Sequence, residues 1–232
     1  MTGNRELMRV HVEALFTHDV EGDLVRVNEP DGAPAPRFFL GRTVDGSVRR
    51  FRHDVDNDVR RQLEAASEDD ILRAQTLGSP ISPSRYEDIL GRVAPVLRSW
   101  SGPAFCFPKE LHAGIGTILV THGNAQLLHP LLQGWVPDVR LCQPMVALTV
   151  DGRAVTVCCS VRRTDLAHEA GVETAPPYRG RGYAAHVVAA WARAVRDMGR
   201  VPLYSTSWQN EASRAVARKL GLIHFGSDLH IT

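Results

Sequence analysis

The sequence predicts an α+β fold in which a mixed N-terminal region precedes a largely antiparallel sheet and a strand–loop–helix unit. Two Asp-Gly pairs, at 45–46 and 151–152, separate runs typical of β-strands, and such pairs favour tight hairpin turns. Between Ala184 and Met198, apolar residues recur at helical spacing, and an extended run that ends at Ala175 precedes them. Hairpins followed by a strand and an amphipathic helix indicate a sheet flanked by helices.

The first hundred residues differ from the rest of the chain in their pattern. Apolar spacing predicts helices over residues 7–15, 55–66 and 86–97, and the first Asp-Gly turn predicts a hairpin over 37–53. The stretch Ser-Trp-Ser-Gly-Pro at 99–103 is rich in turn-forming residues and is the best candidate for a boundary. We therefore expect residues 1–100 to form a lid or a partner lobe, and residues 101–232 to form the main domain.

The second region predicts a sheet interrupted by helices. Strands are expected over residues 104–107, 117–121, 145–150, 153–161, 168–175 and 201–205, and helices over 124–133, 184–198 and 210–220. Gly199 and Gly221 follow the last two helices directly, at the position where glycine commonly ends a helix.

The composition is that of an ordinary globular protein. Its 232 residues carry a net charge of +1 at pH 7, which gives no reason to expect a nucleic-acid or membrane partner. A signal-type N-terminus, an apolar run near the ~18 residues of a membrane span and C-x-x-C spacing are all missing. We expect a soluble cytoplasmic protein with reduced thiols and no metal. Of the 27 basic residues only Lys109 and Lys219 are lysines, which is typical of a GC-rich, bacterial genome. The sequence does not indicate an oligomeric state.

The turn before the helix that begins near Ala184 predicts a phosphate site. Its sequence is Arg179-Gly180-Arg181-Gly182-Tyr183-Ala184. The start of a helix offers free N–H groups and partial positive charge, the glycines let the backbone approach a ligand closely, and the arginines add charge. A triphosphate loop would need Lys-Ser/Thr after Gly182, and a dinucleotide loop would need a third glycine. The alternative is a plain turn with two solvated arginines.

The pattern Arg-x-x-Gly-x-Ala resembles the acyl-CoA pyrophosphate loop of the GNAT superfamily of N-acyltransferases. The approach Pro176-x-Tyr178-Arg179 and the order strand, loop, helix, strand, helix are also similar to that family. The resemblance covers roughly residues 140–232. It implies a strongly twisted, splayed sheet, acetyl-CoA as the co-substrate, and residues 101–232 as an acyl-CoA-binding catalytic domain.

The resemblance also implies which residues hold the cofactor. The backbone N–H groups of the loop would cradle the pyrophosphate, and the strand before it would bind the pantetheine and the thioester. These residues are Gly180, Arg181, Gly182, Tyr183 and Ala184 for the loop, with Arg179 adding charge, and Val172, Glu173 and Thr174 for the strand. Asn210 and Ser213 would face the pantetheine arm. The alternatives are an ordinary N-cap for Asn210 and a bond within the helix for Ser213.

Acyl transfer to an amine also needs a base and a stabilised leaving group. Alternation along the strand places Glu169 and Glu173 on one face, so Glu169 is the first candidate for the base and Glu173 the second. Either carboxylate alternatively serves as a structural partner of the backbone or of an arginine. Many GNAT proteins carry a tyrosine acid seven residues after the asparagine, where this sequence has Ala217. No side chain there donates a proton.

The resemblance implies an N-acetyltransferase that transfers an acetyl group from acetyl-CoA to a primary amine of a small molecule. Two alternatives remain open at this point. One is a protein or peptide N-acyltransferase, although the balanced charge offers no support for a basic, histone-like substrate. The other is a non-catalytic acyl-CoA-binding regulatory module, which the alanine at the position of the usual acid favours.

Overall fold

The computed structural model describes residues 3–30, 32–73, 78–111 and 114–232. The chain divides into two compact units that are not continuous in sequence. The first unit contains the chain up to Phe105 together with residues 205–210 and 224–232. The second contains residues 106–204 and 211–223. The predicted boundary at 99–103 falls inside a strand, β5 (Ser99–Cys106).

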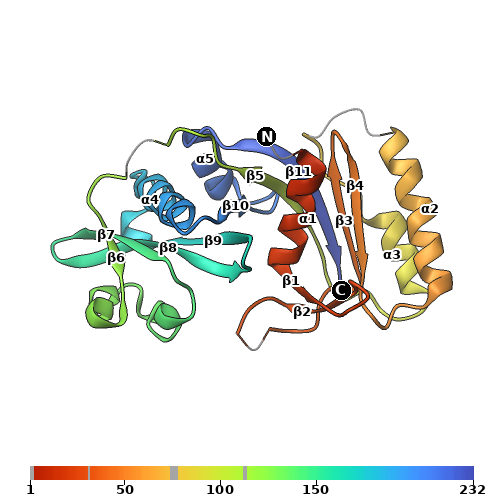
Figure 1. Cartoon of the computed structure of the whole chain (residues 1–232), viewed down its shortest axis with the longest axis horizontal. Coiled ribbons are helices and arrows are strands. Elements are labelled where there is room, and N and C mark those ends of the chain that lie inside the picture. The colour runs from red at the N-terminus through yellow and green to blue at the C-terminus, as the bar shows by residue number, and fades with distance from the viewer. Residues whose placement is uncertain (1–2, 31, 74–77, 112–113) are drawn as a thin grey trace. The chain divides into compact units, whose positions relative to one another are not determined.

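The first unit is a sheet with helices on both faces (Figure 1). Its helices are α1 (Asn4–Leu15), α2 (Asn57–Arg73) and α3 (Ser84–Gly91), and its strands are β1 (Phe16–His18), β2 (Leu24–Val27), β3 (Phe38–Thr43), β4 (Gly46–Phe51), β5 and most of β11 (Ile223–Ile231). The main sheet has the order β4-β3-β11-β5, and β1 pairs with β2 separately.

Two apolar layers hold the first unit together. Helices α2 and α3 pack on one face of the sheet, where Phe38, Leu63 and Tyr86 are fully buried in one cluster. Helix α1 packs on β3, where a Cβ added at Gly41 would collide with the side chain of Met8. A glycine at this strand position therefore lets the helix lie close to the sheet.

The second unit contains the predicted cofactor loop. Its strands are β6 (Thr117–Val120), β7 (Met145–Val150), β8 (Arg153–Arg163), β9 (Ala167–Thr174) and β10 (Val201–Ser205), and its helices are α4 (Tyr183–Asp197), α5 (Glu211–Lys219) and the 3₁₀ segments η1 (His122–Leu128), η2 (Gln133–Trp135), η3 (Pro137–Arg140) and η4 (Pro176–Tyr178). The strand order is β10-β9-β8-β7-β6, antiparallel from β6 to β9 and parallel between β9 and β10.

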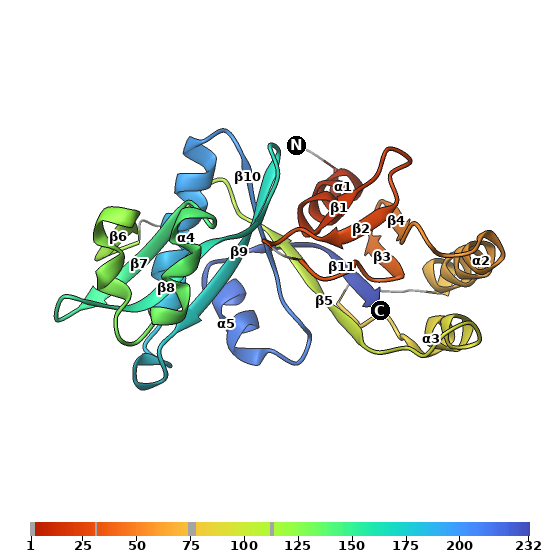
Figure 2. The same cartoon turned by 90° about the horizontal axis from the view of Figure 1, so that it is seen from below.

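Helix α4 covers one face of this sheet and η1 to η3 cover the other, as two views at right angles show (Figures 1 and 2). The apolar residues of α4 that recur at helical spacing, among them Val188, Trp191 and Val195, are fully buried. Gly199 follows the helix with φ +73°, a left-handed conformation that glycine adopts at little cost.

The α+β prediction is confirmed: the fold is a mostly antiparallel, twisted sheet flanked by helices. Both predicted hairpins form. Strands β7 and β8 turn at Asp151-Gly152, as expected, whereas β3 and β4 turn at Val44-Asp45, one residue before the expected pair. The helices expected from 7, 184 and 210 onward form as α1, α4 and α5.

Two predicted helices are wrong in extent or type. The helix expected over 86–97 ends at Gly91, and Val93 and Leu97 are 68% and 81% exposed. The helix expected over 124–133 is replaced by 3₁₀ segments, because Pro130 lacks the N–H donor that a continuous α-helix needs. Strands β1, β2 and β11 were not predicted.

Candidate active site

Strands β9 and β10 separate after a short stretch of pairing. They pair at only three positions, which join Val201 to Ala167, Pro202 to His168 and Leu203 to Glu169. Strand β9 then runs on to Thr174 beyond the last of these pairs. Where two parallel strands separate, the backbone N–H and C=O groups that face the gap no longer pair with the neighbouring strand. Such groups suit a ligand with amides of its own, such as pantetheine. The second unit thus has the splayed sheet that the resemblance implies.

An irregularity in β8 lies beside the point of separation. The register between β8 and β9 shifts between Ser160 and Arg162, so that Val161 is an extra residue on β8. A Cβ added at Gly171 of β9 would collide with the side chain of Val161. Gly171 therefore accommodates this bulge, and bulges of this kind bend strands and increase their twist.

The loop between β9 and α4 has the conformation that an anion site requires. Gly180 and Gly182 have φ angles of +75° and +79°, and Gly182 is the N-cap of α4. Across the part of the chain that the structure describes, no side chain caps this helix and no acidic residue lies in its first turn. The first N–H groups of α4 and the positive end of its dipole are thus left for a ligand.

The two arginines of the loop are anchored on the loop itself. Arg179 donates from Nε to the carbonyl oxygen of Thr174 at 3.0 Å. Arg181 donates from Nη2 to the carbonyl oxygen of Pro177 at 3.2 Å, and its guanidinium lies 5.2 Å from the centre of the Tyr178 ring. These contacts fix the shape of the loop while they keep two positive charges beside it.

A third cation reaches the loop from α5. A Cβ added at Gly182 would collide with Nζ of Lys219, so the ammonium group lies directly over this glycine. Lys219 was not among the site residues predicted from the sequence. The one available signal was that an Arg-rich chain has a lysine in the last turn of the helix after the loop.

The two candidate bases are in different surroundings. Glu169 is 2% exposed and stands at the last pair between β9 and β10, where the strands separate. Glu173 is exposed near the end of β9, and its Oε2 accepts a hydrogen bond of 2.6 Å from the indole Nε1 of Trp135. Both project from the same face of β9, because they are four residues apart in a strand without a bulge of its own.

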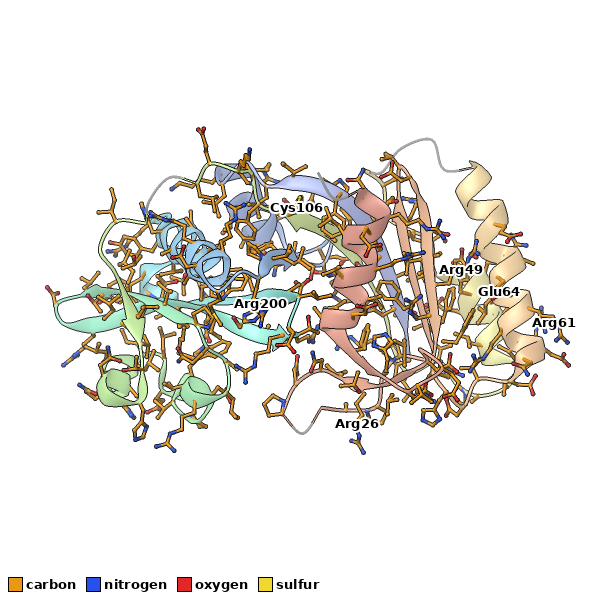
Figure 3. The ribbon with its side chains drawn as sticks, viewed as in Figure 1. Arg26, Arg49, Arg61, Glu64, Cys106 and Arg200 are labelled. Atoms are coloured by element: carbon orange, nitrogen blue, oxygen red, sulfur yellow. The ribbon has the colours of Figure 1, made fainter. Side chains whose placement is uncertain are left out.

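His168 projects from the opposite face of β9 toward α4. Its Nδ1 lies 2.8 Å from Oγ of Ser160, and that oxygen also accepts a 3.1 Å hydrogen bond from the indole of Trp191. Burial, reinforced by Arg163 and Arg200, lowers the pKa of His168 to about 4. Arg200, labelled in Figure 3, also pairs with Asp165 at 3.2 Å. His168 is therefore a neutral structural link between β8, β9 and α4.

The start of α5 carries the other predicted cofactor residues. Asn210 directly precedes the helix and is exposed. Oγ of Ser213 lies 2.6 Å from the hydroxyl of Tyr204, and burial raises the pKa of Tyr204 to about 12. Ala217 is 2% exposed, so the position of the usual tyrosine acid is both apolar and packed.

The cysteines do not supply a nucleophile. Burial raises the pKa of Cys106, labelled in Figure 3, and that of Cys158. A hydrogen bond with Cys142 and burial raise the pKa of Cys159 well above its usual value. Because the thiolate is the reactive form, the raised pKa of each of these three thiols makes it a poorer nucleophile at neutral pH.

The described residues offer neither a metal site nor a membrane-spanning helix. Among them, no group of three or more His, Cys, Asp or Glu side chains is arranged to hold a metal ion. None of the helices in the described part is long and apolar enough to cross a membrane.

The part of the chain that contains this site is similar to a known protein family. Residues 146–226 match the family described as GNAT acetyltransferase. This part of the chain resembles GNAT acetyltransferases. It runs from β7 into β11 and contains the whole cofactor loop and α5, which confirms the resemblance seen over residues 140–232. No curated protein matches the chain.

Several solved structures are similar to this chain. A GCN5-related N-acetyltransferase-like protein from Streptococcus suis 89/1591 is 18% identical with a TM-score of 0.51, covering 99% of this chain and 100% of that one. A GCN5-related N-acetyltransferase from Kribbella flavida is 14% identical with a TM-score of 0.49, covering 100% and 96%. A GNAT-family protein from Novosphingobium aromaticivorans DSM 12444 is 20% identical with a TM-score of 0.49. That match covers 59% of this chain, which spans 65% of that protein's length. At these identities the likeness concerns the fold alone.

Proposed function

We propose that this protein is an N-acetyltransferase that uses acetyl-CoA to acetylate a primary amine of a small molecule. The observation that carries the proposal is the uncapped start of α4 at Gly182, with three cations around it, next to the splayed edge of β9. The family match to residues 146–226 supports the same reaction class. When bound, acetyl-CoA would supply the acetyl group as an activated thioester.

The residues present fit such a cofactor. The N–H groups of Gly182, Tyr183 and Ala184 at the start of α4 suit a pyrophosphate, since no carboxylate of the helix's first turn competes for them in the described chain. The backbone of Val172 and Thr174 lies beyond the last β9–β10 pair and suits the amides of pantetheine. Gly182 and its left-handed φ keep the approach to these N–H groups free of a Cβ.

Glu169 is the better candidate for the base that deprotonates the amine. It stands where β9 and β10 separate, and its burial removes it from bulk water. The carboxylate of Glu173 already accepts the indole hydrogen bond of Trp135, which suits a positioning role better. We assign proton abstraction to Glu169 and the positioning of the end of β9 to Glu173.

Transfer does not depend on a tyrosine acid of α5. Ala217 offers no proton, and Tyr204 is a weak acid with a pKa raised to about 12 by burial. A thiol such as that of CoA has a pKa of about 8.5. Its thiolate is therefore a weak enough base to leave near neutral pH without a proton donor. The missing phenol is therefore compatible with turnover.

The test is release of free CoA thiol from acetyl-CoA in the presence of a panel of small primary amines. We expect turnover with at least one amine, and none with Gly182→Val, which places a β-branched side chain at a left-handed position against the ligand's approach. Circular dichroism checks that the variant is folded. Tight CoA binding without turnover on any amine or peptide would instead indicate an acyl-CoA-binding module, and wild-type affinity of Gly182→Val for CoA would refute the cofactor site.

A further inference from the structure

We propose that Lys219 is a binding residue for the cofactor's pyrophosphate and completes the site from the far end of α5. The inference rests on the proposed function, because it concerns the same acetyl-CoA. It adds a contact that comes from outside the Arg179–Ala184 loop.

The geometry brings two elements together at one glycine. Lys219 is the last residue of α5, and its Nζ occupies the space over Gly182, the N-cap of α4. Any side chain at 182 would displace this ammonium group. The left-handed glycine therefore serves a second purpose, because it opens the helix start to Lys219 as well as to a ligand.

The charges at this point are unbalanced in the protein by itself. A cation is favoured at the C-terminal end of α5, where Lys219 begins, and disfavoured at the N-terminal end of α4, where its Nζ lies. Arg179 and Arg181 add two more positive charges to the same loop. A pyrophosphate is the anion that offsets all of these charges together.

The ammonium group is also uncommitted. Arg218, its neighbour, pairs with Glu211 at 3.9 Å, whereas among the described residues no carboxylate forms an ion pair with Lys219. Arg179 donates a hydrogen bond to the carbonyl oxygen of Thr174, and Arg181 donates one to that of Pro177. All three cations are exposed, but Lys219 is the one on a flexible stem whose donors are still available for a phosphate oxygen.

The sequence has one other lysine, Lys109, which lies near the C-terminal end of α4 and provides a matched control. Lys109 is exposed, and its carbonyl oxygen accepts a hydrogen bond of 3.0 Å from Arg196 in the last turn of α4. Gly182 precedes the first turn. A helix of this length separates the two ends by roughly 20 Å. Lys219→Met and Lys109→Met therefore make the same change of charge and differ in whether the lysine can reach the loop.

The first experiment is calorimetric titration of both variants with CoA, dephospho-CoA and pantetheine. We expect Lys219→Met to weaken CoA and dephospho-CoA equally, by roughly tenfold for one charged hydrogen bond, and to leave pantetheine unchanged. Lys109→Met should match the wild type, and Lys219→Arg should retain most of the affinity. A loss for CoA but not for dephospho-CoA would assign Lys219 to the 3′-phosphate and overturn the proposal, as would an unchanged affinity. Failure of the wild type itself to bind CoA would instead sink the proposed function.

The second experiment compares the rates at which Lys219 and Lys109 are chemically modified in the wild-type protein. Reductive methylation with formaldehyde and a borane reductant is followed by peptide mass spectrometry, with and without saturating CoA. We expect CoA to slow the modification of Lys219 several-fold and to leave Lys109 unaffected. Equal modification of Lys219 in the two samples would contradict the contact, whatever the activity of the enzyme.

Discussion

At the scale of single residues, Glu169 and Glu173 show how one strand gives two carboxylates different surroundings. Glu169 is enclosed where β9 and β10 part, and Glu173 stands near the open end of β9 with an indole hydrogen bond. Alternation along β9 was enough to place both on one face. It gave no information about burial or about Trp135, which is distant in sequence and reaches Glu173 from η2.

The assignment of the base is tested by Glu169→Gln. This variant keeps the shape of the side chain and removes its basicity, so we expect kcat/KM for the best amine to fall ~10²- to 10⁴-fold, the range typical of general base catalysis. CoA affinity measured by calorimetry should stay the same. Glu173→Gln is the matched control, and its rate should fall much less. An unimpaired Glu169→Gln enzyme would show that another group takes the proton.

At the scale of elements, the contact between β8, β9 and α4 depends on a neutral histidine. The pKa of His168 is lowered to about 4 from an ordinary 6.5, mainly by burial, so the unfolded chain binds a proton that the folded chain resists. The stabilisation is therefore fully present above pH 6.5 and is lost as the pH falls from 6.5 toward 4.

The pH dependence of this link is measurable by urea unfolding. We expect the stability advantage of the wild type over His168→Gln to shrink by about 1.4 kcal/mol for each pH unit below 6.5, until about pH 4. His122→Gln, at an exposed histidine of η1, is the control for the substitution itself. A difference between wild type and His168→Gln that is constant from pH 7.5 to 4.5 would mean that His168 titrates normally.

The loop between β9 and α4 offers a paired test of its two left-handed glycines. Alanine at either Gly180 or Gly182 costs about 1–2 kcal/mol of backbone strain, since both have positive φ. Only at Gly182 would the added Cβ also meet another group, Nζ of Lys219, whereas none of the described atoms lies within 4 Å of a Cβ at Gly180. We therefore expect similar losses of thermal stability, but a larger loss of CoA affinity for Gly182→Ala. Equal affinities would show that the space over Gly182 is not part of the site.

At the scale of the whole molecule, the sequence predicted what depends on local pattern. The two hairpins, α4 and its closing Gly199 and the loop itself follow from spacing and turn chemistry within short stretches. The return of residues 205–210 and 224–232 to the first unit depends on contacts between distant segments, and so does the approach of Lys219 to Gly182. Such contacts leave no periodic signal in a single sequence.

Strand β11 escaped prediction for a related reason. Its apolar pattern is interrupted by Ser227 and Asp228, both of which are fully buried. Asp228 is stabilised by His11 of α1, at 2.8 Å, and by His230, at 3.2 Å. Burial alone would raise the pKa of Asp228, and the two histidines outweigh it and hold the pKa well below its usual value. Because two adjacent residues of this core strand are polar, hydropathy alone does not predict the strand.

A crystal structure of the protein with acetyl-CoA bound would test the proposed cofactor site most directly. We predict that the pyrophosphate lies against the N–H groups at the start of α4, within hydrogen-bond distance of Nζ of Lys219. We also predict the pantetheine arm along β9 beyond Glu169, and the carboxylate of Glu169 near the thioester. A cofactor bound away from the loop at Gly182, or one whose pyrophosphate faces neither α4 nor Lys219, would contradict this prediction.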